Sequence, residues 1–283
     1  MQTIGQSSLR SFCPETNEIK AIKCTAIRKS EAIPVNGYLE LAKRIAQLQY
    51  ENREHVLMFR GQPDDYRNKH NNSTIKPSIF RPRHAKYGRL EVGEKFDQLN
   101  EAEVLLVRAY EDAGLPRATE IRRRQVLRWA IIQHYEICDT PLLDVTHSLR
   151  IAASFASDSS DELGYVMVLG VPNVAGAITT SIDSELQVIR LASVCPPEAL
   201  RPHIQEGFLL GEYPDIGGFQ QKQLYADHEV DFGRRLLAKF VFRKKQFWEG
   251  REFLPVSHDA LYPEADDEFS RVAEEVKSGL EAL

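Results

Sequence analysis

The sequence predicts an α/β (α+β) fold in which helices flank a mixed, largely antiparallel central sheet. Two observations support this: short runs rich in Val, Ile, Leu and Phe have the length of buried strands, and segments with helical periodicity lie between them. No Pro/Gly/Ser-rich linker divides the 283 residues into halves with separate cores. We therefore expect an N-terminal arm or irregular cap at residues 1–33 and one domain at residues 34–283.

Periodicity and chain-breaking residues place the elements in order. Apolar residues recur at helical spacing from Tyr38, and a buried strand ended by Gly61 follows. A polar stretch at 64–89 predicts a long surface loop, Gly114 ends the next helix, and Thr119 is a candidate N-cap for the one after it. Helices are predicted at 38–50, 90–113, 119–137, 148–156 and 264–280. Strands are predicted at 56–59, 142–146, 165–171, 177–180, 187–191, 204–210 and 236–242.

Composition narrows the functional classes. No apolar run of about 18 residues could cross a membrane and no export signal is evident, so we expect a soluble, cytoplasmic protein without a membrane partner. The net charge of −5 gives no indication of nucleic-acid binding. The four cysteines form no C-x-x-C pair, which argues against a metal site and predicts reduced thiols. A basic cluster at 117–128 lies on a predicted helix and is interpreted as a solvated face.

The first candidate site is Phe59-Arg60-Gly61-Gln62, at the end of a buried strand. The Arg60 guanidinium could bind a phosphate or carboxylate in bidentate fashion, or it could reach the sheet edge or pair with an internal acid. A glycine directly after it permits positive φ and close approach of a ligand to the backbone. Without further context the structural reading of Arg60 is the stronger one.

The second candidate site joins Gln133-His134-Tyr135, at the end of an apolar helix, to Asp144 and Thr146 on the following strand. A histidine there also suits the helix dipole, and Asp144 or Thr146 could simply cap the helix that begins near Ser148. The alanines of that helix, at 152, 153 and 156, would let it pack closely on the sheet.

The third candidate is Gln205-Glu206, at the predicted start of a strand. A carboxylate there could orient a ribose hydroxyl or stabilise a developing cation, although polar residues at a strand start are usually solvated. The sequence contains no Walker loop, G-x-S-x-G, H-E-x-x-H or G-x-G-x-x-G motif, so the NTPase, hydrolase, zincin and Rossmann classes lose support.

Together these motifs resemble the FRG domain family, over about residues 38–280. The family begins with Phe-Arg-Gly, continues with Gln-His-Tyr-Gly, Pro-Thr-Arg and Leu-Leu-Asp-Trp-Thr, and then has a helix ending in Phe-Ala, which Phe155-Ala156 matches. Gln205 to Phe208 resembles the family's Gln-x-Gly-x-Phe region with one residue fewer. The chain departs from the pattern where Glu136 replaces Gly, 139–141 (Asp-Thr-Pro) replaces Pro-Thr-Arg, and Val145 replaces Trp.

The order of these groups is in turn similar to that of ADP-ribosyltransferases. The resemblance implies an ADP-ribosyltransferase-like fold and NAD as substrate, with a late glutamate that stabilises the oxocarbenium-like transition state or activates the acceptor. It also implies an unidentified macromolecular acceptor and a setting in bacterial toxin or phage-defence systems. The implied catalytic residues are Glu206 and His134, and the implied NAD-binding residues are Arg60, Gly61, Gln62, Gln133, Tyr135, Asp144, Thr146 and Gln205.

Two alternatives from other classes stay open. One is a module that binds a nucleotide or a phosphorylated ligand without turnover, which the altered 139–141 segment favours. The other is an interaction scaffold in which Arg60 and Asp144 form a buried structural pair.

Overall fold

The computed structural model describes residues 8–13, 16, 18–81, 88–173, 175–182, 184–196, 199–213, 231–249, 253–263 and 267–282. The chain forms two compact units, each built from three stretches of sequence. Unit 1 comprises Met1–Ile75, Val145–Ala175 and Asp231–Leu261, and unit 2 comprises Lys76–Asp144, Gly176–Val230 and Tyr262–Leu283.

The sheet of unit 1 has the strand order β3-β10-β6-β4-β5. The β3 strand (Ile33–Pro34) pairs in parallel with β10 (Leu236–Arg243), and every other pairing, through β6 (Leu163–Val171), β4 (Val56–Gln62) and the end of β5 (Leu143–Thr146), is antiparallel. The central strands are mostly apolar, as expected for strands with both faces covered. The prediction of a mixed, largely antiparallel sheet is confirmed for this unit.

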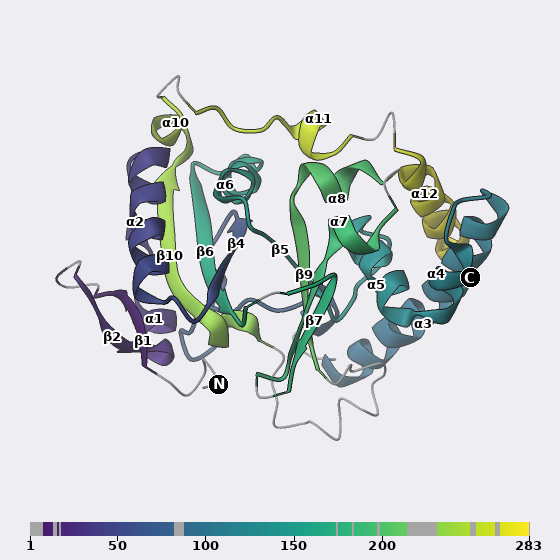
Figure 1. Ribbon diagram of the computed structural model, residues 1–283, viewed down its shortest axis with the longest axis horizontal. Coiled ribbons are helices and arrows are strands. Elements are labelled where there is room, and N and C mark those ends of the chain that lie inside the picture. The colour runs from purple at the N-terminus through teal and green to yellow at the C-terminus, as the bar shows by residue number, and fades with distance from the viewer. Residues whose placement is uncertain are drawn as a thin grey trace. The chain divides into compact units, whose positions relative to one another are not determined.

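One helix of unit 1, α6 (Leu149–Ser157), packs directly on β4 and β6 (Figure 1). Its buried face carries the small residues Ala152, Ala153 and Ala156, which have no exposed surface. The backbone of the helix can therefore approach the strands closely, as the sequence predicted. The longer α2 (Tyr38–Glu51) buries Leu41, Ile45 and Leu48, within the predicted bounds to one residue.

The described residues of the N-terminal segment form regular elements at 8–12, 19–23 and 24–29 rather than an irregular cap. A hairpin of β1 (Ser8–Phe12) and β2 (Ile19–Lys23) precedes α1 (Cys24–Lys29), which packs on β10. The hydroxyl of Ser11 donates to the backbone carbonyl of Leu237 in β10, which fastens the hairpin. Two short helices complete the unit, α10 (Lys244–Phe247) and α11 (His258–Leu261), together with the turn η2 (Phe232–Arg235).

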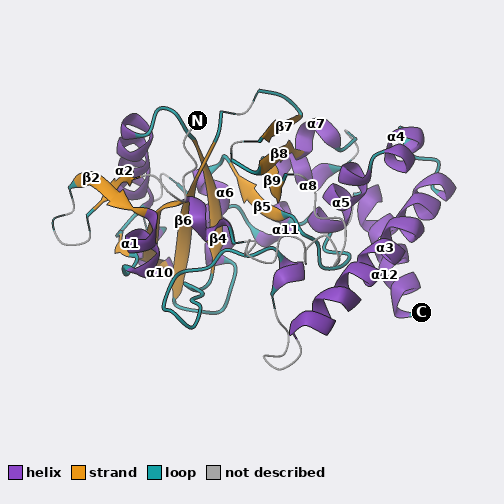
Figure 2. Ribbon diagram, turned by 90° about the horizontal axis from the view of Figure 1, so that it is seen from below, coloured by secondary structure: helices purple, strands orange, loops and turns teal. Residues whose placement is uncertain are grey.

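Unit 2 combines a helical layer with a three-stranded antiparallel meander. The long α3 (Gly88–Asp112) packs on α12 (Glu268–Glu281) and α5 (Gln125–His134), as Figure 2 shows for α3 and α12. The strands run in the order β9 (Gly207–Glu212), β8 (Leu186–Arg190), β7 (Ile178–Ser181). The remaining elements are α4 (Ala118–Arg123), α7 (Leu191–Val194), α8 (Leu200–Ile204) and η1 (Ser78–Phe80).

Two element predictions for unit 2 are wrong in detail. The helix predicted at 119–137 is broken at Arg124, which has extended backbone angles, and Arg128 donates to the carbonyls of Ile121 and Arg122 that the break leaves without helical partners. Thr119 lies inside α4 and is not its N-cap. The strand predicted at 204–210 begins only at Gly207, because the preceding residues form α8.

Candidate functional site

The predicted site residues fall into both units. Unit 1 contains Arg60, Gly61, Gln62 and Thr146, and unit 2 contains Gln133, His134, Tyr135, Asp144, Gln205 and Glu206. The boundary between the units falls inside β5, between Asp144 and Val145. Within unit 2 the structure brings Gln133, His134 and Asp144 into contact.

Asp144 receives hydrogen bonds from the two neighbouring residues at the end of α5. The Gln133 amide nitrogen lies 2.5 Å from Asp144 Oδ2, and His134 Nδ1 lies 3.4 Å from Asp144 Oδ1. An aspartate on a strand is thus connected to a histidine at a helix C-terminus. The carboxylate side chain keeps 37% of its surface exposed, so it is open to solvent on one side.

The other ring nitrogen of His134 is the distinctive feature of the site. The His134 side chain is 3% exposed, and Nε2 is buried without a hydrogen-bond partner among the described residues. A buried polar atom without a partner costs about 1–3 kcal/mol. Gly207, the first residue of β9, lies beside this ring, because a Cβ built on it would be 3.5 Å from His134 Cε1 and 2.7 Å from Leu191 Cδ1. The imidazole therefore lies beside a residue of β9 that has no side chain.

Glu136 takes part in the turn that ends α5 directly after His134 and Tyr135. Its φ of 52° lies in the left-handed region, Ile137 N donates to Ile132 O, and Glu136 N donates to Gln133 O. This is the Schellman arrangement, in which glycine is the preferred residue at the left-handed position. The glycine of the Gln-His-Tyr-Gly pattern is replaced here by a residue that has to adopt the glycine conformation.

The Glu136→Gly variant is expected to be more stable than the wild type, by up to about 1 kcal/mol, because glycine adopts positive φ without the steric cost that a Cβ carries. Urea unfolding monitored by circular dichroism measures the difference. Because the Glu136 side chain is exposed, the difference in stability mainly reports the backbone conformation at this position. A variant less stable than the wild type would show that the carboxylate contributes more than the backbone strain costs.

Tyr135 has a structural partner. Its ring is 1% exposed, and its hydroxyl donates to Asp267 Oδ2 at 2.7 Å, while Asp267 Oδ1 caps α12 by accepting from Phe269 N. Arg201 lies 5.3 Å from the centre of the Tyr135 ring. Burial and the hydrogen bond to Asp267 raise the pKa of Tyr135. Tyr135 therefore fastens α12 to the end of α5, and its predicted role in binding a cofactor stays a prediction.

The Tyr135→Phe variant is expected to lose about 1–3 kcal/mol of unfolding free energy at pH 7, because a buried carboxylate loses a donor. The folded-state pKa of Tyr135 is raised, so the unfolded chain ionises first above the usual tyrosine pKa of about 10. Stability of the wild type should therefore fall above about pH 10, and the phenylalanine variant should lack this component. Urea unfolding at pH 7 and pH 10.5 tests both points, and equal stabilities at pH 7 would contradict the structural role.

Gln205 and Glu206 lie between α8 and β9. Gln205 is 8% exposed, whereas Glu206 is exposed and has a φ of 46°. Glu206 directly precedes Gly207, the residue that lies beside His134. The structure thus places the two predicted catalytic residues in the same unit, with the carboxylate in a turn that faces solvent.

In unit 1 the glycine of Phe-Arg-Gly is a packing residue. A Cβ on Gly61 would lie 1.8 Å from Ala152 O and 2.7 Å from Ala156 N, both backbone atoms of α6. Gly114 is the described glycine with positive φ, and Gly61 pairs with Val166 within the β4–β6 ladder. The interpretation that Gly61 supplies positive φ and backbone access for a ligand is wrong, because α6 occupies that space.

Arg60 and Thr146 lie on opposite faces of the unit 1 sheet. Thr146 pairs with Phe59, whose side chain shares the α6 face with Gly61, and the neighbouring Arg60 projects from the other face. Thr146 Oγ1 accepts from Ser148 N at 3.0 Å, but Ser148 is the N-cap residue of α6 and the helix has no side-chain cap, so Thr146 does not cap it. Arg60 is half-buried, and Gln62 donates to the backbone carbonyl of Asp64.

A buried ion network on the Arg60 face was not predicted. Lys239 lies in the same row across the sheet as Arg60 and is 2% exposed. Its ammonium group donates to Asp65 Oδ2 at 2.8 Å, and the same carboxylate oxygen also binds Arg67. Arg28 pairs with the buried Asp231. Burial lowers the pKa of Lys239, and the Asp65 carboxylate opposes that change. A lysine inside the apolar run at 236–242 was the signal for this network, which ties the loop after β4 to β10.

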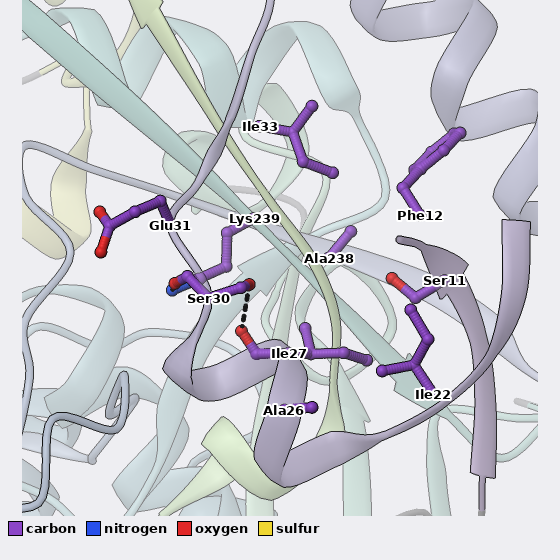
Figure 3. A pocket seen from close by; sticks show the side chains of 10 residues that line it. All are labelled: Ser11, Phe12, Ile22, Ala26, Ile27, Ser30, Glu31, Ile33, Ala238 and Lys239. Carbon is purple, nitrogen blue, oxygen red and sulfur yellow. Dashed lines mark hydrogen bonds between the residues drawn. The ribbon is translucent and has the colours of Figure 1, made fainter. Parts of the chain in front are cut away.

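A small cavity of about 40 Å³ in unit 1 is lined by residues from β1, β2, α1, β3 and β10 (Figure 3). Apolar side chains dominate it, Ser30 Oγ donates to Ile27 O at 2.9 Å, and Lys239 borders it beside Ser30. None of its lining residues is a predicted site residue. Within the described ranges, no three His, Cys, Asp or Glu side chains gather as metal ligands, and no helix has the length and apolar content to cross a membrane.

Comparison with known families bears on the motif predictions. Residues 55–163 match the family model of the FRG domain, a range that contains both sequence blocks quoted for the resemblance. Residues 55–163 thus carry an FRG domain, and the predicted resemblance is confirmed for this range. Gln205 to Phe208 lies outside the matched residues. Comparisons with curated proteins and with solved structures gave no match.

Proposed function

We propose that this FRG-domain protein is an NAD-dependent ADP-ribosyltransferase, with an ADP-ribosyltransferase-like fold, in which His134 contacts the ligand. The observation that carries the proposal is the state of the His134 ring, whose Nδ1 is bound to Asp144 while its buried Nε2 has no partner among the described residues. With Nδ1 of the neutral imidazole as donor to the carboxylate, Nε2 carries a lone pair. It then accepts a hydrogen bond from a ligand hydroxyl.

Such an acceptor suits cleavage of the bond between nicotinamide and ribose. Nicotinamide leaves with the bonding electrons, positive charge develops on the ribose, and a lone pair of the acceptor group forms the new bond to C1′. Electron density given to a ribose hydroxyl by Nε2, supported by the Asp144 carboxylate, stabilises that charge more than it stabilises bound NAD. Groups of this kind contribute about 10²–10³-fold in rate.

Glu206 is the proposed carboxylate for the acceptor. Its exposure in the turn before Gly207 suits a group that accepts a proton from a macromolecule arriving from solvent. The roles of Arg60 in binding NAD phosphates, and of Gln62, Gln133, Tyr135, Thr146 and Gln205 around the ligand, stay sequence-based predictions. The same holds for the macromolecular acceptor, a cytoplasmic location and a setting in bacterial toxin or phage-defence systems.

A binding module without turnover is the second candidate. The observation that favours it is that both ends of the Gln133 amide are used inside the protein, by Thr140 and by Asp144. A side chain bound at both ends keeps one orientation. It suits holding a ligand in place more than moving during a reaction. The Asp-Thr-Pro segment, which lacks the family's Arg, supports the same candidate.

The two candidates are separated by incubating the purified chain with NAD, measuring thermal stabilisation and then released nicotinamide. Binding to the folded state raises apparent stability by mass action. Stabilisation with nicotinamide release supports the transferase, and stabilisation alone supports the binding module. If millimolar NAD neither stabilises the protein nor releases nicotinamide, both candidate functions are rejected.

A further inference from the structure

Thr140 is the first member of a chain of side-chain hydrogen bonds that ends at His134. It has no exposed surface, and its hydroxyl binds the Gln133 amide oxygen. The Gln133 amide nitrogen in turn binds Asp144, and Asp144 binds His134 Nδ1. Each of these four side chains belongs to unit 2. The interior of the unit is thus connected, bond by bond, to the ring that the proposed function places at the ligand.

The donors and acceptors of this chain agree with one another from Thr140 to His134. The backbone N–H of Leu142 donates to Thr140 Oγ1 at 3.2 Å, so the hydroxyl is an acceptor there and its single hydrogen is left for Gln133. That hydrogen requires the carbonyl oxygen of the Gln133 amide, which turns the NH₂ group toward Asp144. An ionised carboxylate only accepts, so it takes the proton-bearing Nδ1 of His134.

The Thr140 hydroxyl is itself held in place by the backbone. Thr140 N donates to Ser78 Oγ at 3.0 Å, and Thr140 O accepts from Ile79 N at 3.2 Å. These bonds fix the residue to η1 on one side while Leu142 fixes it on the other. The hydroxyl cannot turn away from Gln133 without leaving a buried donor unpaired.

We infer that Thr140 is a positioning residue that, through Gln133, holds the Asp144 carboxylate against His134 Nδ1 and so keeps the proton on Nδ1 and the lone pair on Nε2. The ligand group that meets Nε2 must therefore be a hydrogen-bond donor, which includes hydroxyls and amines and excludes carbonyl or phosphate oxygens. The statement about the ligand rests on the proposed function. The statement about the tautomer concerns the free protein alone.

Two substitutions separate this role from simple packing. Thr140→Val keeps the branched shape and removes the hydroxyl, whereas Thr140→Ser keeps the hydroxyl and removes a methyl group. Both variants lose some packing or bonding in the interior, so both are expected to be less stable. Only the valine variant should change the imidazole.

The tautomer is read from long-range ¹H–¹⁵N correlations of the histidine rings in the full chain without NAD. The His134 signals are assigned by their loss in His134→Asn. The wild type and Thr140→Ser are expected to have the proton on Nδ1, and Thr140→Val should shift the tautomer ratio toward Nε2–H by about fivefold or more, as loss of one hydrogen bond implies. Gln133→Met, which breaks the chain one bond later, should give the same shift.

An unchanged tautomer in folded Thr140→Val, or in Gln133→Met should the valine variant not fold, would overturn the inference. A wild-type ring with its proton on Nε2 would also overturn it. Because no NAD is present, neither result depends on the proposed function. Conversely, a chain with the expected tautomers that releases no nicotinamide would reject the transferase and leave the role of Thr140 standing.

Discussion

The Gly61→Ala variant should unfold at a much lower urea concentration than the wild type, with a loss of about 3 kcal/mol or more. The added Cβ would lie 1.8 Å from Ala152 O and 2.7 Å from Ala156 N. Overpacking a core usually costs about 1–3 kcal/mol when side chains can move. Here the obstacles are backbone atoms of α6, so the whole helix has to shift. A domain is stable by only about 5–15 kcal/mol, which makes this a large fraction of the total.

Gly37→Ala is the matched control in the same unit. A Cβ on Gly37 would meet its nearest neighbour, Phe247 O, at 4.0 Å, and the φ of this residue is −163°, which any residue adopts. Its stability should stay within about 1 kcal/mol of the wild type. If Gly61→Ala were as stable as this control, the packing account of the Phe-Arg-Gly motif would be wrong.

The His134→Asn variant is expected to lower the rate of nicotinamide release about 10²–10³-fold, the range for removal of one transition-state hydrogen bond. The asparagine amide nitrogen can replace Nδ1 as donor to Asp144, but nothing replaces Nε2. Since the lost bond is strongest in the transition state, kcat should fall much more than KM rises. The measurement is steady-state nicotinamide release over a range of NAD concentrations.

His70→Asn is the control for this substitution, because His70 is an exposed histidine of unit 1. It should release nicotinamide at the wild-type rate. Circular dichroism and urea unfolding establish that both variants are folded. A His134→Asn protein that is folded and fully active would remove His134 from the catalytic groups.

Much of the fold was predictable because its signals are local. Apolar runs predict the bounds of β4, β6 and β10 to within a few residues. Gly114, with its φ of 65°, follows the end of α3 as expected. These elements bury one face or both faces, and burial leaves a periodic trace in the sequence.

The missed elements depend on contacts that lie far along the chain. The hairpin β1–β2 is fastened through Ser11 to β10, more than two hundred residues later, and it leaves little periodicity in residues 1–33. The break at Arg124 has no glycine or proline to mark it, since Arg128 satisfies the carbonyls that the break exposes. Local propensity does not contain such tertiary partners.

The candidate site was predictable in its residue types and less so in their roles. The connection of His134 to Asp144 and the packing role of the α6 alanines follow from the motifs. Gly61 and Tyr135 have structural roles that sequence spacing cannot separate from ligand binding, because the same residue types serve both. In the sequence Thr140 stands out only as part of a departure from the family pattern, and its bond to Gln133 appears only in three dimensions.

The most direct test of the central claim is to follow the ¹⁵N shift of His134 Nε2 while NAD is added to the wild-type protein. Nε2 is buried and has no partner within the described part of the chain, so a ligand hydroxyl that donates to it should move its resonance by several parts per million. We expect a saturable shift of Nε2 that follows thermal stabilisation by NAD. NAD binding that leaves Nε2 unchanged would contradict the account, because His134 would then not face the ligand.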